Sequence, residues 1–253
     1  MYQLSVVVPT YNESRNIYDL FERTDAALAG IDYELIFVDD SKDDTPQVIE
    51  RLCGEHSNVS MKHRTDEKGL ATAVLCGFSM AKGEYIAVMD ADLQHTPEIL
   101  RAMFAVVSSG YDVCIPSRFI KGGGDGGLNM WRKFVSWSAR MMGKILLSSL
   151  RKVSDPTSGL FMFKRGVIDG ADLQPIGWKI MIEVVAMGSF STLCEIPYVF
   201  CERNAGESKL DSKVTMEYIQ QLFGLLKREK KKKIAVSRFS QEETEQYLQK
   251  LDA

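Results

Sequence analysis

The sequence predicts an α/β protein with a doubly wound, Rossmann-like and mostly parallel sheet that carries helices on both faces. Apolar runs without polar alternation recur between helical stretches in the first 120 residues, as in strands that are buried on both faces. Acidic pairs follow two of these runs, at the sheet edge where open α/β proteins bind their ligands. With 45% hydrophobic and 26% charged residues among 253, the chain can bury a sizeable core.

Strand and helix signals alternate through residues 1–120. Helical periodicity predicts a helix at residues 12–29, with Asn12 as its N-cap. Thr45-Pro46 and Thr96-Pro97 each place a capping Thr before a Pro at the first helical position, so we expect a helix after each pair. The remaining elements predicted in this half are a helix at 70–82 and strands at 3–9, 33–40, 59–62, 84–90 and 111–116.

The pattern changes after Arg118, because five glycines within residues 121–127 predict a flexible loop. Helices are predicted at 128–150, 179–187 and 213–226, and strands at the end of 154–163 and at 193–200. The apolar side chains of the last helix are expected on one face, which consists of Val214, Tyr218, Ile219, Leu222, Phe223 and Leu226. This helix runs into residues 227–233, six of which are basic, and we expect a tail beyond them.

Composition excludes several classes of protein. The 31 Lys and Arg against 34 Asp and Glu give a formal charge of −3, which argues against a nucleic-acid binder. Five scattered Cys indicate reduced thiols in a cytoplasmic protein. The sequence shows no signal peptide and no apolar run near the roughly 20 residues of a membrane helix. We therefore expect a cytoplasmic protein that is soluble or peripheral to a membrane.

Two acidic pairs mark the candidate site. Asp39-Asp40 ends one predicted strand, and Asp90-Ala91-Asp92 ends another, followed by Gln94. There is no G-x-G-x-x-G after the first strand and no P-loop, so a dinucleotide enzyme or a P-loop NTPase is disfavoured. Oxygens of Asp90, Asp92 and Gln94 suit Mg²⁺ or Mn²⁺ held together with a diphosphate. Acidic residues also populate ordinary loops, but two pairs on one sheet favour a function.

Longer motifs resemble those of the family 2 glycosyltransferases of the GT-A fold. They are V-V-V-P-T-Y-N-E at residues 6–13, V-D-D-S at 38–41 and D-A-D-L-Q at 90–94. Further matches, within the polyprenyl- or dolichyl-phosphate mannose synthases, are Ser117-Arg118, D-P-T-S-G at 155–159, Arg203 and G-E-S-K at 206–209. The resemblance covers residues 3–210. It departs in lacking an arginine after Gly159 and the C-terminal membrane helices of many homologues.

This resemblance implies a GT-A domain at residues 1–210, with a nucleotide-sugar half at 1–120 and an acceptor half at 121–210. The segment 211–253 would hold an amphipathic interfacial helix, a basic run and a C-terminal tail. The implied nucleotide-sugar ligands are Pro9, Tyr11, Glu13, Val38, Asp40, Asp90, Ala91, Asp92, Lys179, Arg203 and Lys209. The implied metal ligands are Asp90, Asp92 and Gln94, the acceptor-phosphate ligands Arg118, Arg132 and Ser136, and the catalytic residues Asp92 and Arg118.

The residues themselves agree with several of these roles. Tyr11 offers an aromatic face to a base, and an arginine fork suits phosphate oxygens. Arg132 and Ser136 are four apart and so share one face of a helix. Taken singly, a cation is more often a solvated surface charge, but Arg118, Arg203 and Lys209 each follow a predicted buried strand, which favours a function for these three. His95 is expected to be a packing or surface residue, and Asp155 either a general base or a cap before Pro156.

The resemblance implies metal-dependent transfer of mannose from GDP-mannose to a polyprenyl or dolichyl phosphate with inversion. Such a phosphate is already anionic at neutral pH, so a strong general base is not required. The alternatives are a UDP-sugar donor such as UDP-glucose, a polysaccharide synthase, which the absence of Q-x-x-R-W disfavours, and a non-enzymatic binding module. Expected partners are the cytoplasmic face of a membrane and a membrane-anchored subunit, without nucleic acid.

Overall fold

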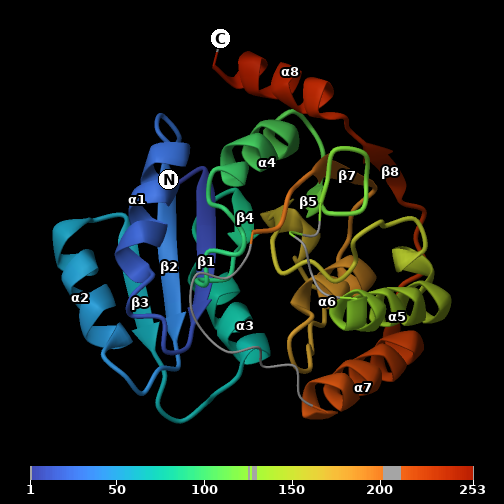
Figure 1. The fold of residues 1–253 in the computed structure, drawn as a ribbon, viewed down its shortest axis with the longest axis horizontal. Helices are drawn as coiled ribbons and strands as arrows, with labels where there is room; N and C mark the ends of the chain where they lie inside the picture. Colours follow the sequence, from blue (N-terminus) through green and yellow to red (C-terminus); the bar gives the residue numbers. More distant parts are fainter. Residues whose placement is uncertain (1, 125, 127–129, 202–211, 253) are drawn as a thin grey trace.

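The computed structural model describes residues 2–124, 126, 130–201 and 212–252, and within these ranges it leaves out the side chains of 130–135, 212 and 213. The described residues form a single eight-stranded sheet of order β3-β2-β1-β4-β6-β5-β7-β8 (Figure 1). Its strands are β1 (Leu4–Thr10), β2 (Tyr33–Asp39), β3 (Val59–His63), β4 (Tyr85–Val88), β5 (Val113–Ser117), β6 (Phe161–Lys164), β7 (Thr192–Pro197) and β8 (Ala235–Arg238).

The sheet is parallel except at β6, which pairs antiparallel with both β4 and β5. The described helices are α1 (Ile17–Ala27), α2 (Thr45–Glu55), α3 (Leu70–Met80), α4 (Ile99–Ser108), α5 (Met130–Leu146), α6 (Ile180–Met187), α7 (Ser212–Arg228) and α8 (Gln241–Leu251), with single turns η1 (Ser148–Leu150) and η2 (Arg165–Val167). The predicted doubly wound, mostly parallel architecture is confirmed.

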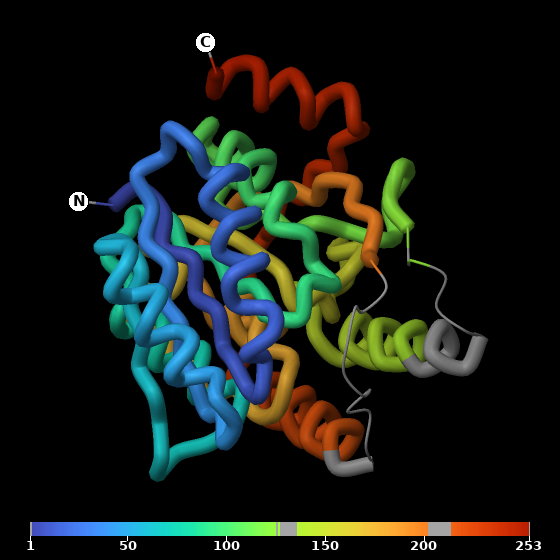
Figure 2. Tube along the Cα trace, turned by 60° about the vertical axis from the view of Figure 1, so that its left-hand side comes forward, coloured from blue at the N-terminus to red at the C-terminus, as the bar shows by residue number. Residues whose placement is uncertain are grey.

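Helices cover both faces because successive strand side chains point to opposite sides. In β1, Val6 and Val8 enter the core under α1, α2, α4 and α8, whereas Val7 enters the core under α3, α6 and α7. All three valines are fully buried. Figures 1 and 2 show α5, α6 and α7 grouped at one end of the molecule, away from α1 and α2. Such two-sided burial explains the unbroken apolar runs in the sequence.

The start of the first helix differs from the prediction. Helix α1 begins at Ile17, and residues 13–16 form turns instead. Asn12 has a φ of 59°, and its side-chain oxygen accepts a hydrogen bond from the Lys42 backbone N–H at 3.0 Å. The prediction that Asn12 caps this helix is therefore wrong: the left-handed Asn12 links the turn after β1 to the turn after β2. Asn16 stands at the N-cap, but its side chain donates to Glu13 Oε2 at 2.7 Å and does not cap the helix backbone.

The predicted C-terminal tail is also wrong for the described residues. Strand β8 adds to the sheet parallel to β7, and α8 packs beside α4 (Figure 2). Ser240 and Glu243 form a reciprocal capping box at the start of α8. The other predicted elements occur within a few residues of their expected places, although residues 128–150 contain α5 and the separate turn η1.

Candidate active site

A cavity of about 880 Å³ lies at the carboxyl ends of β1, β2, β4 and β5. Such an edge is where open α/β sheets bind ligands. It brings together most of the residues that the sequence predicts for the site: Pro9, Tyr11, Glu13, Asp40, Asp90, Ala91, Asp92, Gln94, Arg118, Ser136 and Lys179. Val38 is fully buried in the core beside the cavity rather than at its wall. Arg203 and Lys209 lie outside the described residues, as does the side chain of Arg132.

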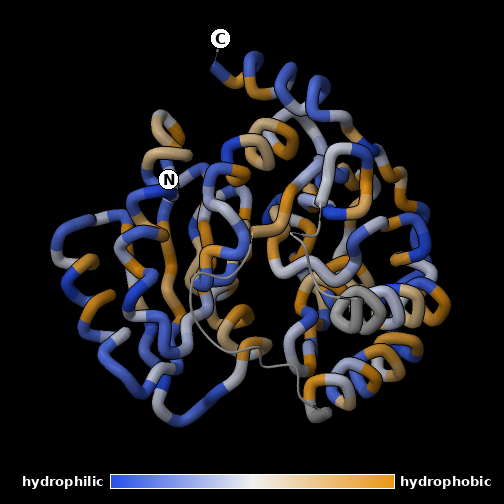
Figure 3. The backbone as a smooth tube through the Cα atoms, in the orientation of Figure 1, coloured by the Kyte–Doolittle hydropathy of each residue, from blue (hydrophilic) through white to orange (hydrophobic). Residues whose placement is uncertain are grey.

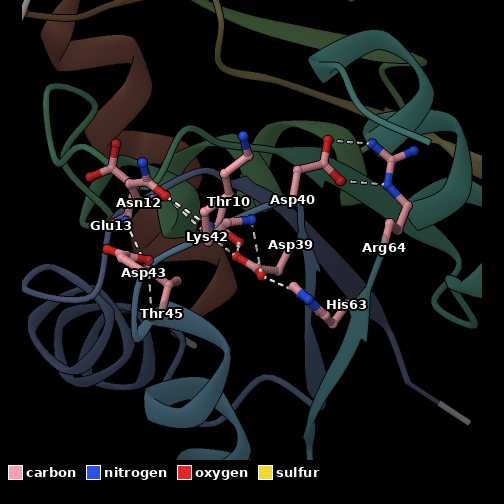
Figure 4. A network of polar contacts seen from close by, with 11 residues as sticks. Thr10, Asn12, Glu13, Asp39, Asp40, Lys42, Asp43, Thr45, His63 and Arg64 are labelled. Atoms are coloured by element: carbon pink, nitrogen blue, oxygen red, sulfur yellow. Dashed lines mark hydrogen bonds and ion pairs between the residues drawn. The ribbon is translucent and has the colours of Figure 1, made fainter. Parts of the chain in front are cut away.

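The two carboxylates after β2 have different tasks (Figure 4). Asp39 is fully buried and accepts hydrogen bonds from Thr10 Oγ1 at 2.8 Å and from Ser41 Oγ, while His63 Nδ1 lies 2.7 Å from its other oxygen. These contacts join the ends of β1, β2 and β3. Asp39 therefore fixes the edge of the sheet, whereas Asp40 lines the cavity.

Asp40 lines the cavity, and Arg64 forms an ion pair with it (Figure 4). Arg64 donates from Nε to Asp40 Oδ1 at 2.8 Å and from Nη2 to Oδ2 at 2.7 Å, and the Gly69 N–H donates to Oδ2 at 2.8 Å. A carboxylate has about four acceptor positions, so Asp40 keeps capacity for a ligand. Both side chains of the pair are almost wholly buried. Because Arg64 fixes the carboxylate of Asp40 at the cavity, it belongs to the site, and the sequence analysis missed it.

The turn after β1 is fixed by residues just before α2 and at its first position. The Asn12 N–H donates to Ser41 Oγ at 2.8 Å, and the Glu13 N–H donates to Thr45 Oγ1 at 2.9 Å. Thr45 Oγ1 in turn donates to Asp43 at 2.6 Å (Figure 4). Tyr11 precedes this turn and lines the cavity with its side chain half exposed. A base could therefore meet an accessible aromatic face on a rigid backbone.

The D-x-D turn after β4 is equally constrained. Leu93 has a φ of 58°, in the left-handed region that is unusual for a leucine. The Gln94 N–H donates to Asp92 Oδ1 at 3.1 Å, and the Gln94 carbonyl accepts from the Tyr198 hydroxyl at 2.6 Å. A Cβ on Gly159 would lie 2.5 Å from Asp90 Oδ2, so this glycine leaves the space that the carboxylate occupies.

His95 forms part of the cavity wall instead of the surface. Its ring stacks on Tyr198 with centroids 5.4 Å apart and meets Phe200 edge to face at 5.2 Å. Burial lowers the pKa of His95 to about 3, and the charge of Arg118 contributes to the shift. Its buried Nδ1 has no hydrogen-bond partner among the residues that the structure describes. The expected packing role is thus correct, but the residue packs inside the site.

Arg118 and Asp155 form a buried, bidentate ion pair. Arg118 donates from Nε to Asp155 Oδ2 at 2.7 Å and from Nη2 to Oδ1 at 2.9 Å. Burial acts to raise the pKa of Asp155, but the hydrogen bonds and charge of Arg118 outweigh it, so that pKa lies below its usual range. A carboxylate with a lowered pKa and both oxygens bound is a poor general base. Asp155 instead orients Arg118, whose guanidinium carbon lies 5.1 and 5.3 Å from the rings of Phe119 and Phe200.

Lys179, immediately before α6, adds a second cation to the cavity. Its Nζ donates to the Thr157 carbonyl at 2.9 Å. Burial lowers the pKa of Lys179, and the charge of Arg118 lowers it further, while Asp90 and Asp155 oppose the shift. Asp90 and Asp92 therefore share one cavity with Arg118 and Lys179, an arrangement that can hold a metal-bound diphosphate together with a second phosphate.

The donor chemistry at the D-x-D turn fits a divalent metal shared with a ligand. Within the described ranges, no group of three or more His, Cys, Asp and Glu side chains forms a metal cage. Asp90, Asp92 and Gln94 supply hard oxygens from one turn of the cavity wall. Mg²⁺ is commonly held by one or two carboxylates with phosphate oxygens completing the coordination, so this small set suits a metal–diphosphate complex.

The sheet and the D-x-D cavity at its edge define a glycosyltransferase of the GT-A fold. Residues 5–170 match the model of glycosyl transferase family 2, and the chain belongs to that family. The chain is 42% identical to the dolichol-phosphate mannosyltransferase of Pyrococcus furiosus over 226 residues, and this match covers 89% of the chain. It spans 64% of the length of that archaeal relative.

Two other relatives carry similar names. The dolichol-phosphate mannosyltransferase of Saccharomyces cerevisiae is 37% identical over 233 residues, covering 87% of this chain and 85% of the yeast protein. The polyprenol monophosphomannose synthase of Mycolicibacterium smegmatis is 31% identical over 214 residues, and the match covers 81% of this chain and 80% of the mycobacterial protein.

Solved structures confirm the fold. The glucosyl-3-phosphoglycerate synthase of Mycobacterium tuberculosis in complex with UDP has a TM-score of 0.64 at 17% identity, over 89% of this chain and 80% of that one. Its complex with Mn²⁺, UDP and glucosyl-3-phosphoglycerate gives 0.64 at 16% identity, over 93% and 88%. Among the described residues, no helix is long and apolar enough to cross a membrane.

Proposed function

We propose that this enzyme transfers mannose from GDP-mannose to a polyprenyl or dolichyl phosphate, with Mg²⁺ or Mn²⁺ and with inversion at the anomeric carbon. The observation that carries the proposal is the cavity that holds Asp90, Asp92 and Gln94 together with Arg118 and Lys179. The relatives are named as mannosyltransferases that act on dolichol phosphate or as a polyprenol monophosphomannose synthase, which supports both the sugar and the lipid acceptor. The proposal assigns most of the donor site to residues 1–120 and most of the acceptor site to residues 121–210. Lys179, Arg203 and Lys209 reach the donor from the second half, and Arg118 reaches the acceptor from the end of the first.

On the donor side, Tyr11 and Asp40 bind the nucleoside, with Pro9, Glu13 and the Val38 segment shaping the pocket. Asp90, Asp92 and Gln94 hold the metal, which supplies charge neutralisation for the diphosphate leaving group. Lys179 contacts the same diphosphate, and the small side chain of Ala91 lets the diphosphate approach the D-x-D turn. Arg203 and Lys209, which lie outside the described residues, are assigned to the donor by resemblance.

On the acceptor side, Arg118 binds the lipid phosphate, aided by Ser136 on α5 and, by resemblance, Arg132. The Asp155 pair fixes the plane of the Arg118 guanidinium. An acceptor phosphate oxygen then forms a bond to the anomeric carbon while the bond from that carbon to the GDP oxygen breaks. Because the phosphate is already anionic, the step needs orientation and exclusion of water rather than a proton acceptor.

The surface near the acceptor half supports peripheral binding to the cytoplasmic face of a membrane. Large apolar side chains are exposed on α5 (Trp137, Met141, Ile145) and α7 (Met216, Phe223, Leu226). Hydrophobic residues recur along both helices in Figure 3. The two helices touch, since the Tyr218 hydroxyl donates to the Ala139 carbonyl at 2.7 Å. A membrane-anchored partner subunit stays a prediction.

The proposal is tested by offering the purified chain GDP-mannose, UDP-glucose or UDP-GlcNAc, each with a short polyprenyl phosphate and Mg²⁺ or Mn²⁺. Label should enter the lipid from GDP-mannose alone. EDTA should abolish transfer, and either metal should restore it. Transfer from a UDP-sugar would reassign the donor, whereas full activity in EDTA would contradict the metal assignment.

A further inference from the structure

The C-terminal strand is connected to the active site through a chain of polar contacts that runs from the half-exposed Arg238 to the buried Glu195 and Asp155. Arg238 ends β8 and lies opposite Glu195 of β7 in the parallel register. Its Nε donates to Glu195 Oε2 at 3.2 Å and to Ser154 Oγ at 2.9 Å, and its Nη2 donates to the Lys152 carbonyl at 2.5 Å. Arg238 thus holds both the buried carboxylate of β7 and the loop that precedes Asp155.

Glu195 is fully buried and carries the contact toward the cavity. Its Oε1 accepts from the Ser154 N–H at 2.7 Å and the Asp155 N–H at 3.2 Å, and its Oε2 accepts from Ser154 Oγ at 2.8 Å. One carboxylate therefore fixes the backbone of the residue whose side chain binds Arg118. A buried carboxylate is costly without a cation, and Arg238 is the charge in salt-bridge contact with it.

We propose that Glu195 and Arg238 are positioning residues for Arg118. Strand β8 supplies Arg238, which bonds Glu195 and Ser154. Glu195 fixes the backbone at Ser154 and Asp155, and Asp155 sets the guanidinium plane of Arg118. Neither Glu195 nor Arg238 lines the cavity, so both act through the loop. The inference rests on the proposed function only in giving Arg118 a phosphate to bind.

A small displacement of Arg118 is sufficient for a large effect. Asp155 contacts Arg118 with both oxygens, so a rotation of the loop changes both bonds together. A misplacement of about 1 Å can reduce a rate by about 100-fold. The donor side contacts the same loop only further along the chain, where Lys179 bonds the Thr157 carbonyl and Gly159 lies beside Asp90. Glu195 and Arg238 bond none of these residues. Loss of Arg238 should therefore reduce kcat and leave nucleotide affinity unchanged.

The test compares Arg238→Met with Arg238→Lys and with the control Arg101→Met. Arg101 also anchors the C-terminal region, since it bonds Asp252 and the Ala29 carbonyl, but it does not contact Glu195. Arg238→Met should lower kcat by about 10- to 100-fold, with the affinity for GDP and Mn²⁺ by calorimetry within about twofold of wild type. Arg238→Lys should recover most of kcat, and Arg101→Met should keep it.

A second readout does not depend on activity. The side-chain Nε–H resonance of Arg118, assigned with Arg118→Lys, should shift and exchange faster in Arg238→Met but not in Arg101→Met. If Arg238→Met does not fold, the double variant Glu195→Gln/Arg238→Met takes its place in both measurements. The double variant has no unpaired buried charge at position 195.

An unchanged resonance and kcat, or equal losses in Arg101→Met, would overturn the inference. A wild-type chain that transfers no sugar would instead overturn the proposed function, with the Arg118 resonance still deciding the positioning role.

Discussion

At the scale of single residues, the site depends on carboxylates that hold arginines. Asp40 holds Arg64 and Asp155 holds Arg118, each with two hydrogen bonds in a buried setting. Such pairs add little net stability when complete, but removing one partner leaves an uncompensated charge. Their contribution is geometric: each fixes the plane of a charged group at the cavity.

Replacing Asp155 with Asn should lower the free energy of unfolding by about 3–5 kcal/mol. The folded-state pKa of Asp155 lies below its unfolded value, so its stabilisation is present above that unfolded value and is lost as pH falls toward the folded one. The difference in stability between wild type and variant should therefore shrink from neutral pH to about pH 3.

Urea unfolding across this range measures the difference, with Asp169→Asn on the exposed surface as control. A difference that is independent of pH would show that Asp155 does not act as an ionised partner.

Gly159→Ala should disturb the D-x-D turn without changing a ligand. The added Cβ would approach Asp90 Oδ2 to 2.5 Å and must displace that carboxylate. We expect the affinity for Mn²⁺ in the presence of GDP to fall by about 10- to 100-fold, as for other losses of metal-ligand orientation. Titration of free Mn²⁺ by electron paramagnetic resonance measures this affinity.

Gly166→Ala is a matched control, because its Cβ would meet only an Asp169 oxygen at 3.9 Å. Equal Mn²⁺ affinity in the two variants would show that Asp90 does not bind the metal.

The sequence identified the residues of this site that act in short motifs. Asp90, Asp92 and Gln94 lie within five consecutive positions, and their oxygens suit one metal whatever the rest of the chain does. The partners of Asp40 and Arg118 lie 24 and 37 residues away. A local pattern contains no information on such pairings, so Arg64 was missed and Asp155 was left between two roles.

At the scale of elements, α7 differs from a helix with a single apolar face. Tyr218, Leu222 and Leu225 are buried against the core, whereas Met216, Phe223 and Leu226 are exposed. Periodicity predicted the helix and its apolar positions, but the six residues expected on one face are divided between core and surface. Which side of a helix meets the core depends on tertiary packing.

Single substitutions should separate the two faces of α7. Leu222→Ala should cost about 2–5 kcal/mol of unfolding free energy, because this fully buried side chain leaves a cavity. Phe223→Ala, at a side chain that is 53% exposed, should change stability by no more than about 0.5 kcal/mol. The same Phe223→Ala should weaken binding to lipid vesicles.

Thermal unfolding and vesicle sedimentation measure both effects. A large loss of stability in Phe223→Ala would place its side chain in a structural contact rather than at a lipid surface.

The C-terminal elements β8 and α8 form although the sequence pattern did not predict them. Strand β8 has four residues with exposed and half-exposed side chains, so no apolar run marks it. It forms because β7 offers an edge, and α8 follows because Tyr247 and Leu248 pack on the core near α4. The capping box of Ser240 and Glu243 was the one local signal available.

At the scale of the whole molecule, the six basic residues at the end of α7 and directly after it do not act as one group. Lys227, Lys230, Lys231 and Lys233 are exposed. Lys232 turns inward: its Nζ donates to the Gly188 carbonyl and lies 4.3 Å from the Phe190 ring, and burial lowers its pKa to about 8. Arg228 also points inward, to Glu183 at 2.9 Å. Membrane attraction would come from four of the six basic residues.

Replacing these four exposed lysines with Gln should therefore reduce binding to anionic vesicles by at least about tenfold at low salt, since each basic residue near such a surface contributes about 1 kcal/mol. Lys232→Gln should leave vesicle binding unchanged, because that lysine is already engaged within the protein. Added salt should release the wild-type chain and have little effect on the quadruple variant. Co-sedimentation with vesicles of rising anionic content measures all three. Binding that ignores salt and both sets of substitutions would contradict a lipid surface, and the exposed faces of α5 and α7 would then fit a protein partner.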